Sequence, residues 1–250
     1  MTKDTANDDS VVERSGKNRV DGTTSRRRVL AASAVLSAGA AGVSPAVSAG
    51  DKHDRKGSEE EPPAEEIVDE PPEAVPDEFA NDIEILNFAR TLEFLEAEFY
   101  TRGLENIDAA EFQQEFEQFG VLGDVAVERL QVVRDHEITH AEVLGQTVEL
   151  LGGEPVASPE FDFGTTVQNP AEFVATGALL EDVGVSAYAG AAPSIENADL
   201  VPPALSIHSV EARHASFLRE LNGEIGFPMA FDQPRSRSEV LELASGFIVE

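Results

Sequence analysis

The chain has 250 residues, which is enough for one or two domains with a real hydrophobic core. It carries 18 Lys and Arg against 48 Asp and Glu, so its formal net charge is −30, which argues against nucleic acids and anionic membranes as partners. The absence of Cys excludes disulfides, thiolate metal sites, Cys nucleophiles and anchors attached to a lipidated Cys.

Lys is nearly missing from the chain, since it occurs only at positions 3, 17, 52 and 56. An acidic surface whose positive charges come almost entirely from Arg indicates a protein from a halophile. Molar salt shortens the Debye length to about 3 Å and screens the self-repulsion of such a surface. An ordinary acidic protein would explain the charge but not the missing Lys.

Residues 1–49 predict an export signal. A polar start is followed at 25–30 by Ser-Arg-Arg-Arg-Val-Leu and then by a short, Ala-rich apolar run. This order is typical of a secretory signal, and the paired arginines resemble a twin-arginine signal, with cleavage expected after Ala49. Pro45 and the many small residues argue against a membrane anchor, so we expect an exported, extracellular protein without one.

Residues 50–78 predict a disordered linker, because they are acidic, rich in Pro and too polar to bury a core. The folded domain is predicted over 79–250. It opens at Asn81, where an apparent capping box starts a helix that is expected to end at Gly103.

Three further long helices are predicted, over 122–151, from Pro170 to Gly190, and from about 202 to 222. Residues 104–120 indicate a short helix or an ordered connection. Residues 153–169 indicate a long loop that Phe161 and Phe163 pin to the bundle, and residues 238–248 a last short helix. No segment shows sustained strand alternation. The fold class is therefore all-α: a four-helix bundle with a long crossover loop between its second and third helices and a short C-terminal helix.

Each long helix carries a Glu inside its apolar stripe. Two of these belong to a Glu-x-x-His pattern, which places a carboxylate and an imidazole one turn apart on one helix face. Two such patterns and two single inward Glu residues are the ligand set of a dinuclear carboxylate site in a four-helix bundle. The candidate metal ligands are Glu93, Glu137, His140, Glu181, Glu211 and His214.

An internal repeat supports this choice. Residues 137–144 align with 211–218, and Leu92-Glu93 aligns with Leu180-Glu181. The second alignment also superposes Tyr100 on Tyr188, the only two Tyr in the chain, each seven residues after its Glu and about 10 Å further along the helix. Two helix hairpins related by pseudo-symmetry would bring these groups together.

The same alignment ranks the remaining polar residues. Glu96 aligns with Gly184 and so has no acidic counterpart, but it lies one turn from Glu93 on nearly the same face and is kept as a reserve ligand. His136 and His208 align with Val210 and Arg134 and have no symmetric partner, so we place them around the ligands or at the surface. The residues expected to surround the metal ligands are Tyr100, Tyr188, His208 and Arg134. The two Tyr either hydrogen-bond ligands or relay an electron, or they are core aromatics whose hydroxyls found partners.

The ligand set resembles that of the ferritin-like di-iron carboxylate superfamily, which includes rubrerythrins and bacterioferritins. The stretches 87–89, 92–100, 137–140 and 189–193 are similar to exported ferritin-like domain proteins, some of which are labelled desiccation-related. The resemblance covers roughly residues 80–250. The chain departs from rubrerythrin in lacking its Cys-rich iron site.

The resemblance implies a bundle that holds two bridged metal ions. Glu93 and Glu181 would then be single-helix carboxylates, Glu137 and Glu211 would bridge or chelate, and the two His would each bind one ion. Iron is the family expectation, so two Fe ions are the predicted cofactors, with Mn or Zn open. Four ionised Glu would match the charge of two divalent ions with both imidazoles neutral.

Several alternatives stay open. The acids could lie on solvated faces, or they could form a metal-free hydrogen-bond network. With metal bound, the protein could be an oxidoreductase, ferroxidase or peroxide-reducing, that acts on O2, peroxide or Fe(II), or it could resemble a di-manganese catalase. It could instead store metal or protect against stress without turnover. The acidic linker argues against a closed storage cage, and a smaller homo-oligomer stays open.

Overall fold

The computed structural model describes residues 71–249, so the expected export signal at 1–49 and residues 50–70 of the expected linker lie outside the described residues. Residues 71–78 form no helix or strand and are mostly exposed. Phe79 is the first residue to pack against the core, with its ring 5.3 Å from that of Phe88.

Helix α2 (Asp82–Asn106) starts where its capping residues predict. The Asn81 side chain accepts a hydrogen bond from the backbone N–H of Glu84 at 3.1 Å. The Glu84 carboxylate accepts from the N–H of Ala80, one residue before the position that a capping box uses. The helix continues three residues beyond the expected end at Gly103.

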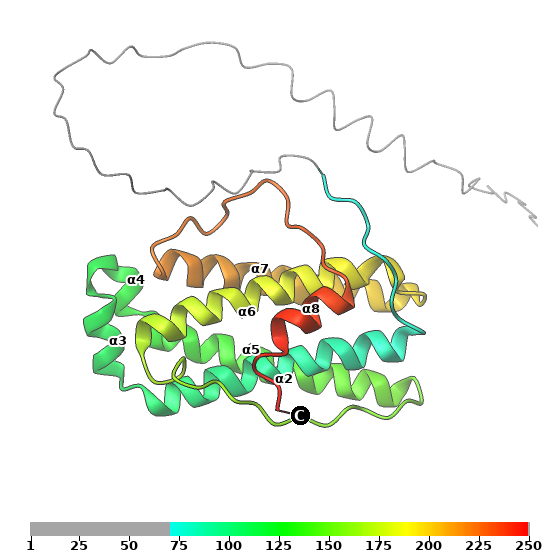
Figure 1. Ribbon diagram of the computed structural model, residues 1–250, viewed down its shortest axis with the longest axis horizontal. Coiled ribbons are helices and arrows are strands. Elements are labelled where there is room, and N and C mark those ends of the chain that lie inside the picture. Colours follow the sequence, from blue (N-terminus) through cyan, green and yellow to red (C-terminus); the bar gives the residue numbers. More distant parts are fainter. Residues whose placement is uncertain (1–70, 250) are drawn as a thin grey trace, which may run out of the picture. The chain divides into compact units, whose positions relative to one another are not determined.

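The connection after α2 is helical. Helix α3 (Ala109–Glu115), a 3₁₀ turn η1 (Glu117–Phe119) and helix α4 (Val121–Asp124) lie at one end of the bundle (Figure 1). Phe112 and Phe116 bury their rings there. Helix α5 (Ala126–Leu150) then starts four residues later than predicted, because Val125 separates it from α4. Just beyond its end, Gly152 has a φ of 80°, a left-handed conformation that glycine adopts without a side-chain clash.

The second half of the bundle begins with helix α6 (Pro170–Ala191), which the Asn169 side chain caps and Pro170 opens. Two 3₁₀ turns, η2 (Ala192–Ser194) and η3 (Ala198–Leu200), lead to helix α7 (Val201–Leu221). A Ser236 cap starts the last helix, α8 (Arg237–Ala244).

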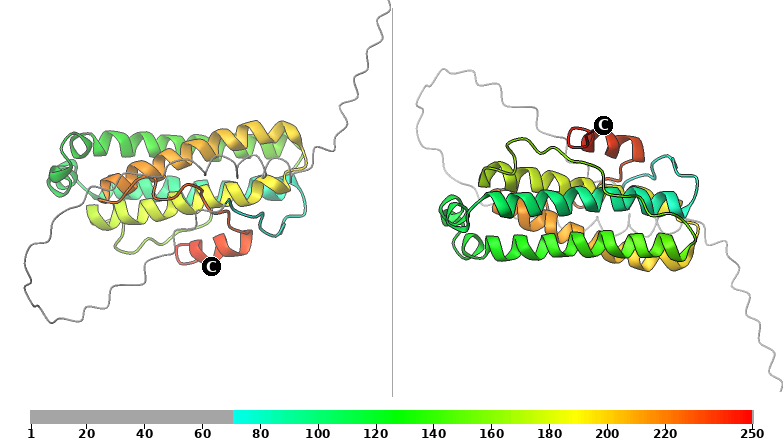
Figure 2. Two further views of the ribbon diagram at one scale, coloured as in Figure 1. Left: turned by 90° about the horizontal axis from the view of Figure 1, so that it is seen from above. Right: turned by 90° about the horizontal axis from the view of Figure 1, so that it is seen from below.

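The four long helices form two antiparallel hairpins, α2 with α5 and α6 with α7, which meet mainly through α2 and α6 (Figures 1 and 2). The loop 151–169 returns along the outside of the bundle, so α5 and α6 run parallel (Figure 1). Phe161 and Phe163 are both buried, as expected, and Phe163 meets Phe99 edge to face at 5.4 Å. The predicted all-α bundle with a long crossover is confirmed.

Helix α8 packs outside the bundle against α6 (Figure 2). The chain leading to it lies so close to α6 that a Cβ at Gly190 would be 1.9 Å from the backbone oxygen of Arg235. Val240 and Ala244 are buried, whereas Leu241 is exposed. Ile248 pairs with Phe161 in a single β-bridge, and residues 71–249 contain no other strand pairing.

None of the helices between residues 71 and 249 is long and apolar enough to cross a membrane.

Candidate metal centre

The six predicted ligands meet in the middle of the bundle, because each long helix turns its inward Glu toward the other three. Two groups of four side chains place ligand atoms within 4.8 Å of one another. The first group is Glu93, Glu137, His140 and Glu211, and the second is Glu137, Glu181, Glu211 and His214. All four Glu residues are at most 1% exposed, so the alternative of solvated carboxylates is wrong.

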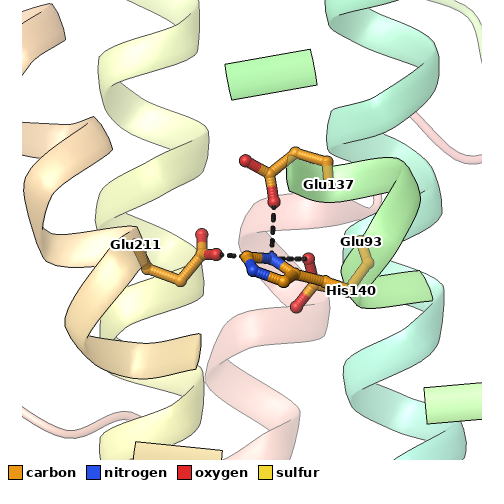
Figure 3. Close-up of side chains that lie close together, drawn as sticks. All are labelled: Glu93, Glu137, His140 and Glu211. Atoms are coloured by element: carbon orange, nitrogen blue, oxygen red, sulfur yellow. Dashed lines mark hydrogen bonds and ion pairs between the residues drawn. The ribbon is translucent and has the colours of Figure 1, made fainter. Parts of the chain in front are cut away.

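The first group surrounds the imidazole of His140. Its Nδ1 lies 3.0 Å from Glu137 Oε2, 3.2 Å from Glu93 Oε2 and 3.1 Å from Glu211 Oε1. Figure 3 shows the three carboxylates, from α2, α5 and α7, converging on one nitrogen of the ring. The His140 side chain is 12% exposed, so this half of the cluster is the one nearer to solvent.

The second group repeats this arrangement around His214. Its Nδ1 lies 2.8 Å from Glu137 Oε1 and 3.2 Å from Glu181 Oε2. The two imidazoles therefore offer the same ring nitrogen to the same kind of oxygen cluster. This is the pseudo-symmetry that the sequence repeat predicts.

Glu137 and Glu211 belong to both groups. Among the described residues, Glu211 Oε2 is buried without a partner, while Glu137 Oε1 and Glu211 Oε1 are buried with one imidazole nitrogen each beside them, His214 Nδ1 at 2.8 Å and His140 Nδ1 at 3.1 Å. A buried carboxylate oxygen without such a partner costs several kcal/mol unless a cation satisfies it. The two shared residues are thus the ones with unused coordinating capacity.

The two Tyr residues connect the hairpins crosswise. The Tyr100 hydroxyl on α2 donates to Glu181 Oε1 on α6 at 2.5 Å, and the Tyr188 hydroxyl on α6 donates to Glu93 Oε1 on α2 at 2.5 Å. Each bond leaves the second oxygen of its Glu facing a histidine. Both hydroxyls therefore hydrogen-bond candidate ligands, which is one of the alternatives that the sequence leaves open.

Glu96 adds a fifth buried carboxylate, since it is only 3% exposed. Gly184 makes the room for it: a Cβ at that position would lie 3.1 Å from Glu96 Oε1 and 3.3 Å from Glu211 Oε2. The sequence repeat aligns these same two residues, so the glycine of one hairpin faces the acid of the other. Glu96 is outside both groups of four, and the symmetry of the site is broken at this point.

His136 is the neighbour of the cluster that the sequence described least well. Its Nδ1 lies 3.0 Å from His214 Nε2, and the two rings stack with centroids 5.2 Å apart. It precedes His140 by four residues, and this one-turn spacing was the available signal. The exposed ring of His136 therefore stacks against His214, a candidate ligand on the neighbouring hairpin.

The expectation for Arg134 and His208 needs correcting. Arg134 donates to Asp135 at 2.7 Å beside solvent, and His208 lines a surface pocket together with Arg213 and Phe227. In the described part of the chain, neither residue hydrogen-bonds a member of the cluster. Both lie three residues before a candidate Glu, a spacing that shares a helix face, yet both side chains stay only half-buried and end on other groups.

Both histidines hold a proton when only protein surrounds them. Burial opposes the charge of His140, yet hydrogen bonds with Glu137, Glu211 and Glu93 raise its pKa to about 12. The same balance, with Glu137 and Glu181 as partners, raises the pKa of His214 to about 10. Two protonated imidazoles thus take the place of cations among the acids.

The carboxylates divide into one that stays ionised and several that resist ionisation. Burial acts to raise the pKa of Glu137, but the hydrogen bonds from His140 and His214 lower it to about 2. Burial raises the pKa of Glu93 to about 7. Burial, together with the charge of neighbouring carboxylates, also raises the pKa values of Glu96, Glu181 and Glu211.

The donor set fits hard or borderline divalent cations. It offers carboxylate oxygens and imidazole nitrogens, which suit Fe, Mn or Zn, and it offers them twice around two shared carboxylates. Metal binding would displace the protons from the imidazoles, because a coordinating histidine must be neutral. The buried Glu and His cluster could therefore hold metal ions.

Comparison with known proteins agrees with this geometry. The family model described as "Ferritin-like domain" matches residues 81–224, a span that starts at the N-cap of α2 and ends just after α7. No curated protein matches the chain.

Proposed function

The chain belongs to the ferritin-like family, and from this membership and its buried cluster we propose that it binds two divalent metal ions, iron foremost, in a dinuclear carboxylate centre. The observation that carries the proposal is the sharing of Glu137 and Glu211 between the two groups of four. Of their buried oxygens, Glu211 Oε2 has no partner, and Glu137 Oε1 and Glu211 Oε1 each face only a histidine nitrogen, as the oxygens of bridging carboxylates would before metal binds.

In this proposal each ion takes one histidine and one unshared carboxylate. His140 and Glu93 serve one position, and His214 and Glu181 serve the other. Four ionised Glu residues balance two divalent ions when both imidazoles are neutral. Glu96 adds no charge when it keeps its proton, which its raised pKa favours.

The surrounding residues orient these ligands. The hydroxyls of Tyr100 and Tyr188 fix the two unshared carboxylates, and His136 fixes the ring of His214. Partners of this kind set the orientation and basicity of metal ligands.

Two ferrous ions at such a centre would supply two electrons, one each, which with two protons convert O2 to hydrogen peroxide or hydrogen peroxide to two waters. On this basis we propose an oxidoreductase of the ferroxidase or peroxide-reducing kind. The burial of the cluster keeps bulk water away from the ligands, which suits redox chemistry with a small oxidant.

Metal titration tests this proposal. The full chain should take up two Fe(II) per molecule without oxygen and should turn over when O2 or peroxide is added. Glu137→Gln should lose one or both ions, because Glu137 serves both positions. Glu142→Gln changes an exposed acid of the same helix and should bind as the wild type does. No metal uptake by the folded wild type would refute the proposal, and uptake without turnover would favour storage or a structural role.

We also propose that the protein is exported through the twin-arginine pathway and works in high salt. The arginines at 26–28, the apolar run behind them and the scarcity of Lys support this. The predicted mature chain begins at Gly50. Intact-mass measurement of protein collected outside the source cells tests this, and a chain that still carries residues 1–49 there would contradict cleavage.

A further inference from the structure

A small cavity lies beside the candidate centre, toward the end of the bundle where α7 begins. It measures about 50 Å³, and all four long helices line it. Tyr188 forms part of its wall, and the hydroxyl of this same residue donates to Glu93 Oε1. The cavity is therefore separated from a candidate metal ligand by one side chain.

The lining of this cavity is almost entirely apolar. Only three of its residues have polar side chains, and each uses its polar atoms elsewhere. Asp82 accepts from the backbone N–H groups of Glu196 and Asn197, at 2.8 and 3.0 Å. Thr147 donates to the carbonyl of Val143 at 2.8 Å, and the Tyr188 hydroxyl is bound to Glu93.

The size and chemistry of the cavity select the molecules that can occupy it. A water molecule needs roughly 10–15 Å³ of such space and two to four polar partners, so this cavity has room for a few small molecules but little to hold water. Hydrogen peroxide is excluded for the same reason, since burying its hydroxyl groups without partners is costly. A small apolar molecule gives up no hydrogen bond when it enters the cavity.

The cavity also has a route to the surface. Val143 lines it and is 44% exposed, and Pro203, at the start of α7, lines it and is exposed too. These residues lie on α5 and α7, which pack together much less closely than α2 and α6 do. A small molecule can therefore enter between α5 and α7 without passing the ligands.

We propose that this cavity admits O2, a small apolar gas, to the Tyr188 side of the candidate centre. The inference rests on the proposed function, and it deepens that function by naming O2 rather than peroxide as the oxidant that arrives by this path. The polar side of the cluster, where His136 is exposed and His140 is partly so, is the separate path open to water and peroxide.

Xenon, an apolar atom that needs no metal, tests the cavity itself. Methyl NMR of the metal-free full chain under xenon should show saturable shifts at Leu144 and Ile207, which line the cavity, and none at exposed Leu150. Ala191→Leu fills the cavity from α6 and should abolish these shifts. Ala175→Leu makes the same change on the outside of α6 and should preserve them. Absence of xenon shifts in the folded wild type overturns the proposal, whether or not the protein binds metal.

The oxidant assignment needs the metal-loaded protein. Stopped-flow oxidation of Fe(II)-loaded Ala191→Leu should be several-fold slower with O2 at limiting concentration and unchanged with peroxide, and Ala175→Leu should match the wild type with both. Slowing by Ala191→Leu that is equal for the two oxidants, or absent for both, overturns the O2 path. Failure to bind two ions would instead refute the proposed function, while the xenon result would still decide the cavity.

Discussion

Glu93 is a carboxyl group whose surroundings oppose its ionisation. It is 1% exposed, and burial raises its pKa to about 7. In the unfolded chain a Glu ionises near pH 4.5, so above that pH the unfolded state has lost a proton that the metal-free folded state still holds. The stability that Glu93 contributes therefore falls as pH rises from 4.5 to about 7 and is constant above.

Glu93→Gln should remove this pH dependence, because an amide does not titrate. Relative to this variant, the metal-free wild type should lose about 1.4 kcal/mol of unfolding free energy per pH unit within that window. Denaturant unfolding at several pH values measures it. Glu105→Gln, at an exposed position of the same helix, should behave as the wild type does. A constant difference between wild type and Glu93→Gln across the window would show that Glu93 ionises normally.

The two tyrosines allow a separate test of each of the two proposed metal positions. Tyr188 bonds Glu93, which belongs to the His140 group, and Tyr100 bonds Glu181, which belongs to the His214 group. Tyr188→Phe should weaken one metal position by about 10- to 100-fold, and Tyr100→Phe should weaken the other to a similar degree. Competition titrations with a chelator measure both affinities, and each variant is the control for the other. Unchanged binding in both would mean that the hydroxyls do not orient ligands.

At the scale of residues, spacing alone located much of the site. The two Glu-x-x-His patterns and the repeat identified all six side chains that the bundle brings together. The repeat could not predict the features that break its symmetry. Glu96 joins the cluster because Gly184 leaves space across the helix contact, and His136 reaches His214 on the other hairpin. Such contacts depend on how two helices face each other, which no single helix pattern specifies.

At the scale of elements, the position of helix α8 depends on one close contact between the backbone that precedes it and helix α6. The backbone N–H of Arg235 donates to the Ser186 carbonyl at 3.0 Å, and the Arg235 carbonyl lies where a side chain at Gly190 would be. Gly190→Ala must therefore move the segment before α8 away from α6. It should lower the unfolding free energy by about 1–3 kcal/mol and speed amide exchange in α8.

The control for this substitution is Gly246→Ala, whose added methyl meets no atom within 4 Å. Hydrogen exchange and denaturant unfolding should separate the two variants. If Gly190→Ala kept full stability and full protection of α8, the contact with Arg235 would be weaker than its geometry indicates.

The helices were predictable where their ends carry chemical signals. Asn81 and the Asn169-Pro170 pair set the starts of α2 and α6, and Gly152 follows the end of α5. The start of α5 was wrong by four residues, because the short helices before it continue the same apolar pattern without a clear break. The path of the crossover loop depends on tertiary contacts, which a local pattern does not specify. Phe161 and Phe163, separated by one polar residue, make these contacts by burying their side chains.

At the scale of the whole molecule, the net charge of −30 should make stability depend on salt. Raising KCl from about 0.1 M to about 1 M shortens the Debye length from about 10 Å to about 3 Å and should screen the repulsion between surface acids. The unfolding free energy of the full chain should rise over this range. Sucrose at matched osmolality, which screens no charge, should stabilise less. Equal stabilisation by both solutes would contradict the electrostatic explanation.

The central claim is that one buried cluster holds two metal ions through shared carboxylates, and anomalous diffraction from crystals of the Fe(II)-loaded protein tests it most directly. The claim predicts two iron peaks about 3.5–4 Å apart. Glu137 and Glu211 should contact both peaks, His140 only one, and His214 only the other. A single peak, iron bound only at exposed acids, or a cluster that keeps its protonated histidines and takes no metal would contradict the claim.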